Sequence, residues 1–314
     1  MILVTGGAGF IGSHAVRALH GQGEECLLLQ RRSPEVPPHL PDLPVRMVQG
    51  DIGDLESLRA AGRDHTITGI LHLAITLPWE PGNDDPIGAA GRPVEGLLNV
   101  VRVAQEWGVR RVVMASTIGV YAGVPDAGAL REDRPLSLAP SAAIPTQKKI
   151  AELLAGQLAA ATGVEIVTAR ISGTWGPGGH LPDPFFAAPS LADGAARGAA
   201  PDLSGLMRPP YADDALDLCY VKDTGRALAL LLTAPSLHHA TYNVGSGRAT
   251  SNADVIAAIE ATVPGFQVDL PVRETPAPQQ WLDTSRLRAD TGFVPKYDVA
   301  AAAADYVAWL RADR

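Results

Sequence analysis

Cysteine is scarce in this chain, with Cys26 and Cys219 the two present in 314 residues. Both stand in apolar, strand-like runs, so we expect buried, inert thiols rather than a disulfide or a metal-binding pair, and we expect no metal site. Long hydrophobic runs are also missing, because none reaches the roughly 18 residues that cross a bilayer. A strand is expected from Ile2, with no basic leader before it. We therefore expect a cytoplasmic protein with no membrane partner.

Basic residues are also fewer than acidic residues. The sequence has 26 Lys and Arg against 34 Asp and Glu, a formal net charge of -8. Nucleic-acid binding depends on basic surfaces, so this balance argues against a nucleic-acid partner. A hydrophobic content of 46% and a charged content of 19% are typical of a soluble globular protein.

What the chain does contain is a glycine-rich turn between a short apolar run and a helical apolar spacing, within residues 2–13. Gly7, Gly9 and Gly12 fit G-x-G-x-x-G, and a related G-x-x-G-x-x-G spacing starts one residue earlier. Glycine permits the tight turn, the approach of a pyrophosphate to the backbone and close helix packing. The N–H groups of the helix N-terminus then face the phosphates. The residues predicted to contact a dinucleotide here are Gly6, Gly9, Phe10, Ile11 and Gly12.

Strand-like and helix-like segments alternate through the first half of the chain. The strand-like runs are 2–4, 26–30, 45–48, 69–74, 110–115 and 164–168, and the helix-like segments between them are 11–20, 54–61, 93–107 and 146–161. Such alternation predicts parallel strands joined by right-handed crossovers, and hence an α/β fold with a doubly wound parallel sheet.

The pattern loosens after Arg170. Residues 176–212 are rich in Gly and Pro and have little periodicity, which is typical of a segment that covers a substrate. Beyond it we expect a strand at 218–221, a strand at 242–244 and helices at 223–233, 252–262 and 299–311. We predict a nucleotide-binding domain over 1–175, to which 213–250 returns, and a smaller, mainly substrate-binding C-terminal lobe within 176–314.

Further motifs extend over nearly the whole length, and together they resemble the extended short-chain dehydrogenase/reductases of the epimerase/dehydratase branch. The matching stretches are 5–12, 50–52, 72–74, 115–117, Tyr121, Arg170, 175–177, 220–223, 242–247 and 292–295. The resemblance implies a Rossmann-type NAD(P)-binding domain and a substrate that is often a sugar nucleotide. It also implies that Asp51 and Ile52 hold the adenine and that Ala74 lies beneath the nicotinamide-side ribose.

The end of the second strand distinguishes NAD from NADP. An acid there accepts hydrogen bonds from a free ribose 2′-hydroxyl, but this chain has Gln30, followed by Arg31 and Arg32. A neutral side chain next to two guanidinium groups suits a 2′-phosphate. We therefore predict NADP, with NAD as the alternative.

The catalytic pattern is incomplete. In the family a Ser or Thr positions the substrate oxygen, and a Tyr and a Lys in Y-x-x-x-K shuttle the proton and hold the ribose. Thr117, four residues before Tyr121, takes the first role, and Lys148 takes the last. The tyrosine position is Ile144, and no tyrosine occurs between Tyr121 and Tyr211. Isoleucine has no ionisable proton, so the usual acid/base step cannot use this position.

Another group must then carry the proton, and the sequence leaves the choice open among Lys148, Thr117, His180, Tyr211 and a bound water. Tyr121 is mainly structural in the family. Sugar-nucleotide 4,6-dehydratases carry Asp-Glu directly after the Thr, whereas this chain has Ile118 and Gly119, which disfavours water elimination.

The substrate side also departs from the family. Gly173 stands where many relatives have a substrate-binding Asn, and Leu216 stands where an arginine often meets a diphosphate. Arg273 matches a second such arginine. The predicted substrate contacts are Thr117, Gly173 and Arg273.

These observations predict an epimerase/dehydratase-like oxidoreductase that acts on a sugar nucleotide or related small metabolite with a non-standard acid/base group. Two alternatives stay open. One is a non-redox lyase, isomerase or cyclisation catalyst that keeps NADP(H) structurally, and the other is an NADP(H)-binding regulatory protein. The resemblance further suggests a homodimer through helices 93–107 and 146–161.

Overall fold

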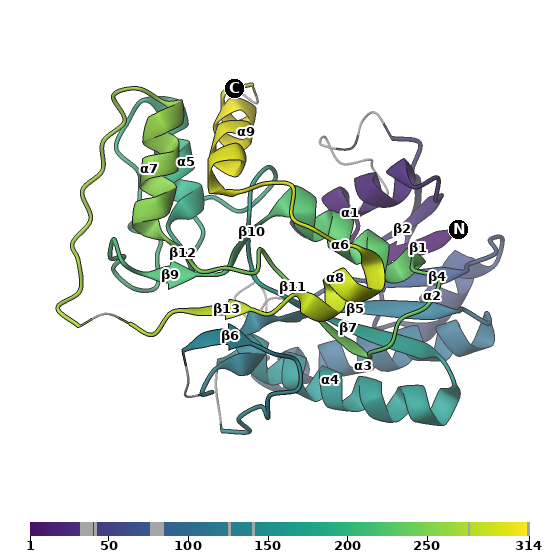
Figure 1. Ribbon diagram of the computed structural model, residues 1–314. Helices are drawn as coiled ribbons and strands as arrows, with labels where there is room; N and C mark the ends of the chain where they lie inside the picture. Colours follow the sequence, from purple (N-terminus) through teal and green to yellow (C-terminus); the bar gives the residue numbers. More distant parts are fainter. Residues whose placement is uncertain are drawn as a thin grey trace.

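A seven-stranded parallel sheet forms the centre of the computed structural model, which describes residues 1–31, 40, 43–75, 85–124, 127–139, 142–275 and 277–312 (Figure 1). Its strands are β1 (Ile2–Thr5), β2 (Cys26–Gln30), β3 (Arg46–Gln49), β4 (Gly69–His72), β5 (Arg111–Thr117), β7 (Glu165–Ile171) and β11 (Thr241–Val244). They lie in the order β11-β7-β5-β4-β1-β2-β3, and every neighbouring pair is parallel. This order confirms the predicted Rossmann-type doubly wound sheet.

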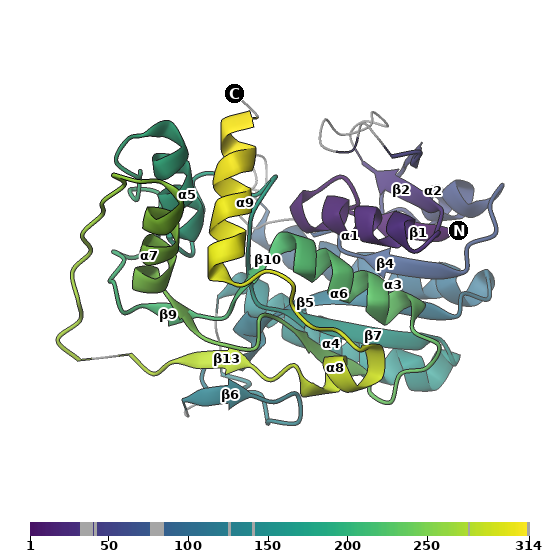
Figure 2. The same cartoon turned by 45° about the horizontal axis from the view of Figure 1, so that its top comes forward.

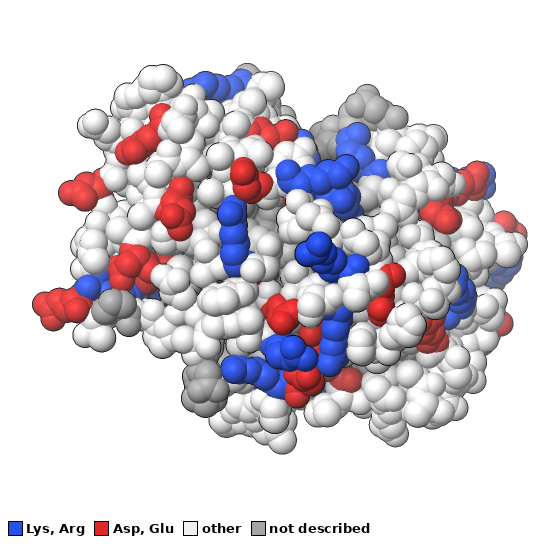
Figure 3. All heavy atoms as spheres, viewed as in Figure 1, with Lys and Arg blue, Asp and Glu red and all other residues white. Residues whose placement is uncertain are grey.

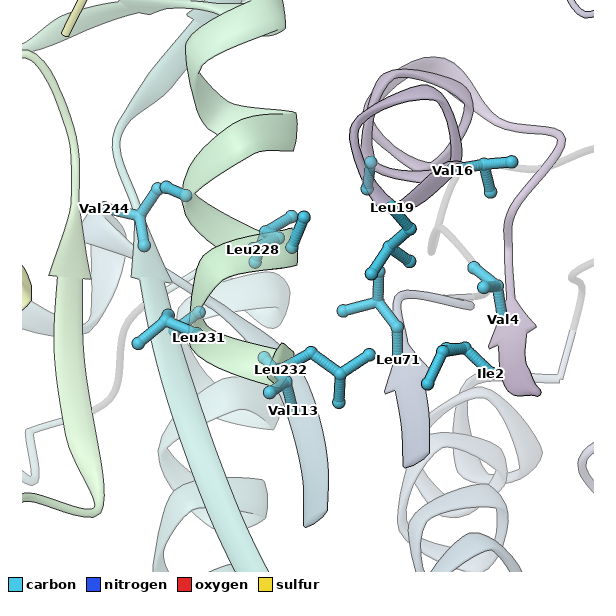
Figure 4. Packing of buried hydrophobic residues seen from close by; sticks show 14 of the residues in the cluster. Ile2, Val4, Val16, Leu19, Leu71, Val113, Leu228, Leu231, Leu232 and Val244 are labelled. Atoms are coloured by element: carbon cyan, nitrogen blue, oxygen red, sulfur yellow. The ribbon is translucent and has the colours of Figure 1, made fainter. Parts of the chain in front are cut away.

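Alternation along the strands sends apolar side chains to both faces of the sheet. On β1, Ile2 and Val4 belong to a core with α1 (Phe10–Gly21) and α6 (Val221–Thr233), whereas Leu3 faces the other side. Figure 4 shows Leu19 of α1 and Leu232 of α6 directed toward this sheet face. The opposite face is covered by α2 (Leu55–Gly62), α3 (Pro86–Glu106) and α4 (Ala143–Thr162). The sheet is therefore buried on both sides.

A separate apolar core holds the C-terminal helices together. It joins α5 (Ala188–Arg197), α7 (Asn252–Thr262) and α9 (Val299–Ala312) around Trp175 and Tyr306. Figure 2 shows these three helices grouped beside the sheet. The chain reaches this group through the short pairs β8 (Gly173–Trp175) with β10 (Leu218–Tyr220) and β9 (Ala215–Leu216) with β12 (Thr250–Ser251). Within 213–250, α6 and β11 lie on the large sheet.

The strands and helices expected in the first half are confirmed, but some elements were not predicted. Helix α5 lies inside 176–212, where an irregular segment was expected. It was missed because it contains Pro189 and Gly194 among small residues, a composition typical of loops. Helix α3 begins before the expected 93–107, because Asp85 caps it by accepting a hydrogen bond from the Ile87 N–H. The pair β6 (Gly128–Leu130) with β13 (Gln280–Leu282), the 3-10 turn η1 (Ile118–Tyr121) and α8 (Ser285–Thr291) were also missed.

The distribution of surface charge and the burial of both cysteines agree with what the composition predicts. Figure 3 shows acidic and basic side chains interspersed over the face that it presents. Cys26 and Cys219 are buried free thiols, as expected, and burial raises the pKa of Cys26 to about 12. In the part of the chain that the structure describes, no helix has both the length and the apolar character needed to cross a bilayer.

Candidate cofactor and active site

The glycine turn after β1 has a conformation that needs glycine at two positions. Gly6 has φ +72°, and a Cβ there would lie 2.9 Å from the Ala74 nitrogen. A Cβ on Gly12 would overlap the Gly6 carbonyl oxygen and lie 2.8 Å from the Gly7 Cα. The Gly9 N–H donates to the Gly6 carbonyl at 3.1 Å and closes the turn just before α1. The turn thus leaves bare backbone and free helix N–H groups facing outward, which suits a pyrophosphate.

A cavity of about 480 Å³ lies at the carboxyl ends of the parallel strands, within the usual size range of cofactor sites. Ten predicted cofactor residues line it, namely Gly6, Gly9, Phe10, Ile11, Gly12, Gln30, Arg31, Asp51, Ile52 and Ala74. Sequence reasoning missed other lining residues, among them Ala115, Ile171 and, as a cofactor contact, His180. The position of Ala115 and Ile171 near the ends of β5 and β7 is the signal that could have identified them. Arg32 lies outside the described residues.

The loop after β3 is held firmly at one end of this cavity. The Asp51 carboxylate accepts a hydrogen bond from the Gly53 N–H at 2.8 Å, and the Asp51 N–H donates to Ser57 Oγ at 3.0 Å. Asn99 on α3 donates from Nδ2 to the Ile52 carbonyl at 3.0 Å. Helices α2 and α3 therefore position the two residues expected to hold the adenine.

Gln30 ends β2 beside the same loop and has a buried side-chain Nε2 with no hydrogen-bond partner among the described residues. Buried donors are normally satisfied, so this N–H group is placed for an acceptor that a ligand would bring. Arg31 follows it in the cavity lining, and its carbonyl accepts from Gln49 Nε2 at 3.4 Å. The glycine turn and this orphaned donor both fit a dinucleotide.

Thr117 ends β5 two residues beyond Ala115 of the cavity lining, although it does not line the cavity itself, and it caps η1. Its Oγ1 accepts a hydrogen bond from the Gly119 N–H at 3.1 Å, which leaves the hydroxyl proton available for a further acceptor. The first turn of α4 packs against this turn, because a Cβ on Gly119 would lie 2.9 Å from Pro145 Cγ. Ile144, the residue before Pro145, is half-buried there. The predicted position of the family's tyrosine therefore carries a hydrocarbon side chain.

Lys148 lies one turn further along α4 and points under β5. Its Nζ donates to the Ala115 carbonyl at 2.7 Å, and Ala115 itself lines the cavity. Burial lowers the pKa of Lys148 to about 8, although the Glu152 carboxylate opposes the shift. The amine is therefore close to its titration range at physiological pH.

Tyr121 is committed to a buried hydrogen-bond network. Its hydroxyl donates to Asn243 Oδ1 at 2.8 Å and accepts from Arg170 Nη1 at 2.8 Å. Arg170 also pairs with Glu152 at 2.7 Å, and Glu152 accepts from Ser116 Oγ at 2.5 Å. Burial raises the pKa of the Tyr121 phenol. Since both functions of the hydroxyl are used within the protein, Tyr121 is a structural residue here.

The remaining predicted site residues do not all lie at the cavity. His180 is exposed at the edge of the cavity and lines it. Tyr211 lies under the Arg273 guanidinium at 4.1 Å from its ring centre, and Arg273 pairs with Asp214 at 2.7 Å, away from the cavity lining.

Gly173 lies on β8, also outside the lining, and a Cβ there would be 2.7 Å from Leu216 Cδ2. The two substitutions on the substrate side therefore contact each other. Among the residues that the structure describes, no group of three or more His, Cys, Asp or Glu side chains is placed to hold a metal ion.

Comparison with known proteins agrees with this geometry. The model of the NAD dependent epimerase/dehydratase family matches residues 2–245. UDP-glucose 4-epimerase of Azospirillum brasilense is 30% identical, covering 95% of this chain and 88% of its own, and dTDP-glucose 4,6-dehydratase of Streptomyces niveus is 28% identical, covering 100% and 93%.

Two solved structures are similar over almost the whole chain. The UDP-glucose 4-epimerase of Stenotrophomonas maltophila with bound NAD and formylated UDP-arabinopyranose has a TM-score of 0.82 and 25% identity, covering 99% of this chain and 98% of its own. The Thermus thermophilus UDP-glucose 4-epimerase complex with NAD has a TM-score of 0.76 and 28% identity, with the same coverage.

Proposed function

This chain belongs to the NAD dependent epimerase/dehydratase family, and we propose that it uses NADP(H) to transfer hydride at a hydroxyl or carbonyl carbon of a sugar nucleotide or related small metabolite. The observation that carries the proposal is the cavity of about 480 Å³, which joins the glycine turn, Asp51 and the ends of β5 and β7. The relatives named above are epimerases and dehydratases, so the non-redox and regulatory alternatives are not favoured.

Each residue of the site has a role that follows from its position. When bound, the dinucleotide supplies the carbon that accepts and returns hydride. Lys148 would hold the nicotinamide-side ribose from beneath β5, where its amine now donates to the Ala115 carbonyl. Thr117 would direct its hydroxyl proton to the substrate oxygen while Oγ1 keeps its bond to the Gly119 N–H. Ile144 excludes water from the place of the phenol but moves no proton.

The preference for NADP over NAD is supported by the end of β2. The orphaned Nε2 of Gln30 is a donor, so it suits the oxygens of a 2′-phosphate, and Arg31 lines the same part of the cavity. A carboxylate at position 30 would instead repel that phosphate. Neighbouring structures contain NAD, which makes the nucleotide preference a direct test of this part of the proposal.

We also propose a cytoplasmic homodimer. The reduced, buried state of both cysteines supports the compartment. Exposed apolar side chains on α4, Ile150 and Leu153, support an interface through α3 and α4. A monomer in sedimentation at micromolar concentration would contradict the dimer.

The decisive experiment restores the phenol. Purified protein loaded with NADP⁺ is mixed with UDP-glucose, UDP-glucuronate or dTDP-glucose, and reduced cofactor is followed in a single turnover. We expect measurable hydride transfer in the native chain and faster transfer in Ile144→Tyr, because a phenol at this position adds a general acid/base. Ile144→Phe, which adds the ring without the hydroxyl, is the control. Absence of hydride transfer in native protein and in Ile144→Tyr, with every nucleotide sugar tried, would refute the function.

A further inference from the structure

The loop that follows β8 is held against the glycine turn. His14 on α1 bonds through Nε2 to the Pro177 carbonyl at 3.0 Å. A Cβ on Gly179 would lie 3.2 Å from Phe10 Cζ, so the loop backbone touches the ring that follows the glycine turn. Because it is fixed at two points of α1, the loop places its next residue, His180, in the cavity lining.

The loop that carries His180 continues from β7 through β8, so we group His180 with the β5–β7 side of the cavity rather than with Gln30 and Asp51. Residues 115 and 171, near the ends of β5 and β7, line the cavity together with His180, whereas Gln30 and Asp51 follow from β2 and β3. If the dinucleotide lies as proposed, the adenosine occupies the β2–β3 side and the nicotinamide the β5–β7 side. His180 then stands at the reacting end.

His180 also supplies a side chain that can exchange a proton, which Ala115 and Ile171 on the β5–β7 side of the cavity do not. The described lining residues include three side chains that can be charged, namely Arg31, Asp51 and His180. Arg31 does not lose its proton near neutral pH, and Asp51 is bound to the Gly53 N–H at the adenosine end. Histidine exchanges a proton near neutrality, and an exposed imidazole can pass it to water.

The other candidates have different proposed roles or lie outside the cavity: Thr117 directs its hydroxyl to the substrate oxygen, and Lys148 holds the ribose. Thr117 accepts the Gly119 N–H, and the Lys148 amine donates to the Ala115 carbonyl. Both functions of the Tyr121 hydroxyl are used, and Tyr211 lies under Arg273 outside the cavity lining.

Resting on the hydride-transfer function proposed above, we propose that His180 is the proton carrier that takes the place of the absent phenol. When a substrate alcohol is oxidised, its C–H bond breaks with the electron pair leaving as hydride to the dinucleotide. The O–H proton passes to a ring nitrogen of His180, and the C=O double bond forms from the O–H electron pair. In the reverse direction the imidazolium returns the proton to the alkoxide oxygen as hydride returns to carbon.

Three titratable groups lie near His180 on the elements packed around its loop. Asp183, in the same loop, accepts the N–H groups of Phe185 and Phe186 at 2.8 and 3.2 Å, and its negative charge favours the imidazolium. His14 lies behind the loop, and Lys148 lies behind Ala115. Oxidation needs the neutral ring as the proton acceptor, so acidic pH should slow it.

A binding experiment tests the placement without turnover. The imidazole ring carbons are labelled, and the His180 NMR signal is identified by its loss in His180→Gln. We expect NADP⁺ and NADPH to shift this signal differently, because only the oxidised nicotinamide is positively charged. The control ligand is 2′-phospho-ADP-ribose, which lacks the nicotinamide. Equal shifts with all three ligands, or no shift with any, would overturn the proposal, since His180 would then lie at the pyrophosphate or outside the site.

A kinetic experiment tests the role. Single-turnover hydride transfer with NADP⁺ and UDP-glucose is measured in native protein, His180→Gln and His20→Gln, the last removing an exposed imidazole at the end of the same helix as His14. We expect His180→Gln to lose roughly 10²-fold in rate, to bind NADP⁺ within about twofold of native protein, and to recover with added imidazole. The slowing of native protein at acidic pH should be absent from His180→Gln.

The outcomes separate this inference from the function on which it rests. Unchanged hydride transfer in His180→Gln, or a loss that is explained entirely by weaker NADP⁺ binding, overturns the role of His180 and leaves the proposed function intact. If native protein transfers no hydride to or from any nucleotide sugar, the proposed function fails, and the NMR arm still decides whether His180 faces the nicotinamide.

Discussion

The two ends of the cavity depend on different parts of the polypeptide. At the adenosine end and the glycine turn, binding relies on backbone: the φ of Gly6, the missing Cβ of Gly12 and a loop held by α2 and α3. At the proposed nicotinamide end, the family resemblance implies proton transfer through one phenol, and this chain has Ile144 at the corresponding position. A binding site spread over backbone atoms survives many side-chain changes, whereas chemistry that needs one ionisable oxygen is altered by a single substitution.

The largest effect should come from the backbone end. In Gly12→Ala the new Cβ would overlap the Gly6 carbonyl oxygen, so the turn must open and lose its phosphate-facing geometry. We expect the affinity for NADP⁺ to fall at least about 100-fold, measured by calorimetry. Gly21→Ala at the end of α1 is the matched control, because a Cβ there meets nothing within 4 Å. Equal affinities of the two variants for NADP⁺ would contradict the conclusion that binding at this end depends on the backbone.

A second substitution tests the proposed adenosine end of the cavity. Gln30→Glu places a carboxylate beside the ribose 2′ position, which repels a 2′-phosphate and accepts from a hydroxyl. The ratio of Kd values for NAD⁺ and NADP⁺ should move toward NAD⁺ by about tenfold or more. Gln105→Glu makes the same charge change at an exposed position near the end of α3, outside the cavity lining. A similar shift in both variants would mean that net charge alone is responsible.

The nicotinamide end should respond to pH through Lys148. Its pKa of about 8 means that the amine is charged below that value and loses its charge above it. Raising the pH from about 7 to about 9 should therefore weaken binding of the anionic NADP⁺ several-fold, as measured by fluorescence titration. In Lys148→Arg the guanidinium stays charged over this range, so the dependence should disappear. A pH dependence that persists in Lys148→Arg assigns the effect to another group.

The smallest effect on chemistry is expected at Tyr121. Tyr121→Phe leaves Asn243 Oδ1 and one Arg170 donor without their partner, so the free energy of unfolding should fall by about 1 to 3 kcal/mol. Hydride transfer should change less than about twofold. Tyr306→Phe is the control, because its buried hydroxyl has no hydrogen-bond partner among the described residues. A large loss of hydride transfer in Tyr121→Phe with unchanged stability would contradict the structural role.

Much of the fold could be predicted because the signals are local. The apolar runs of β1 and β2 and the glycines between β1 and α1 specify strand, turn and helix within a few residues. The pairing of β6 with β13 could not be predicted, since residues 128–130 meet residues 280–282 from a distant part of the chain. Helix α5 was missed because its buried alanines and glycine resemble a loop composition.

The site was predictable to the same extent. Family motifs located Gly12, Asp51 and Lys148, whose neighbours in space are set by the sheet. His180 was one candidate among several, because only the contacts of its loop with His14 and Phe10 place it in the cavity lining. Residues positioned by remote contacts carry no local signal of that position.

The pairing of β6 with β13 has a consequence for synthesis on the ribosome. Residues 128–130 emerge long before 280–282, and Tyr121 emerges 122 residues before its hydrogen-bond partner Asn243. Until the last sixth of the chain appears, the nascent protein exposes an unpaired strand edge and an incomplete polar core. Such long-range closure is slow and open to wrong pairing, so truncation before residue 280 should yield aggregation rather than a free nucleotide-binding half.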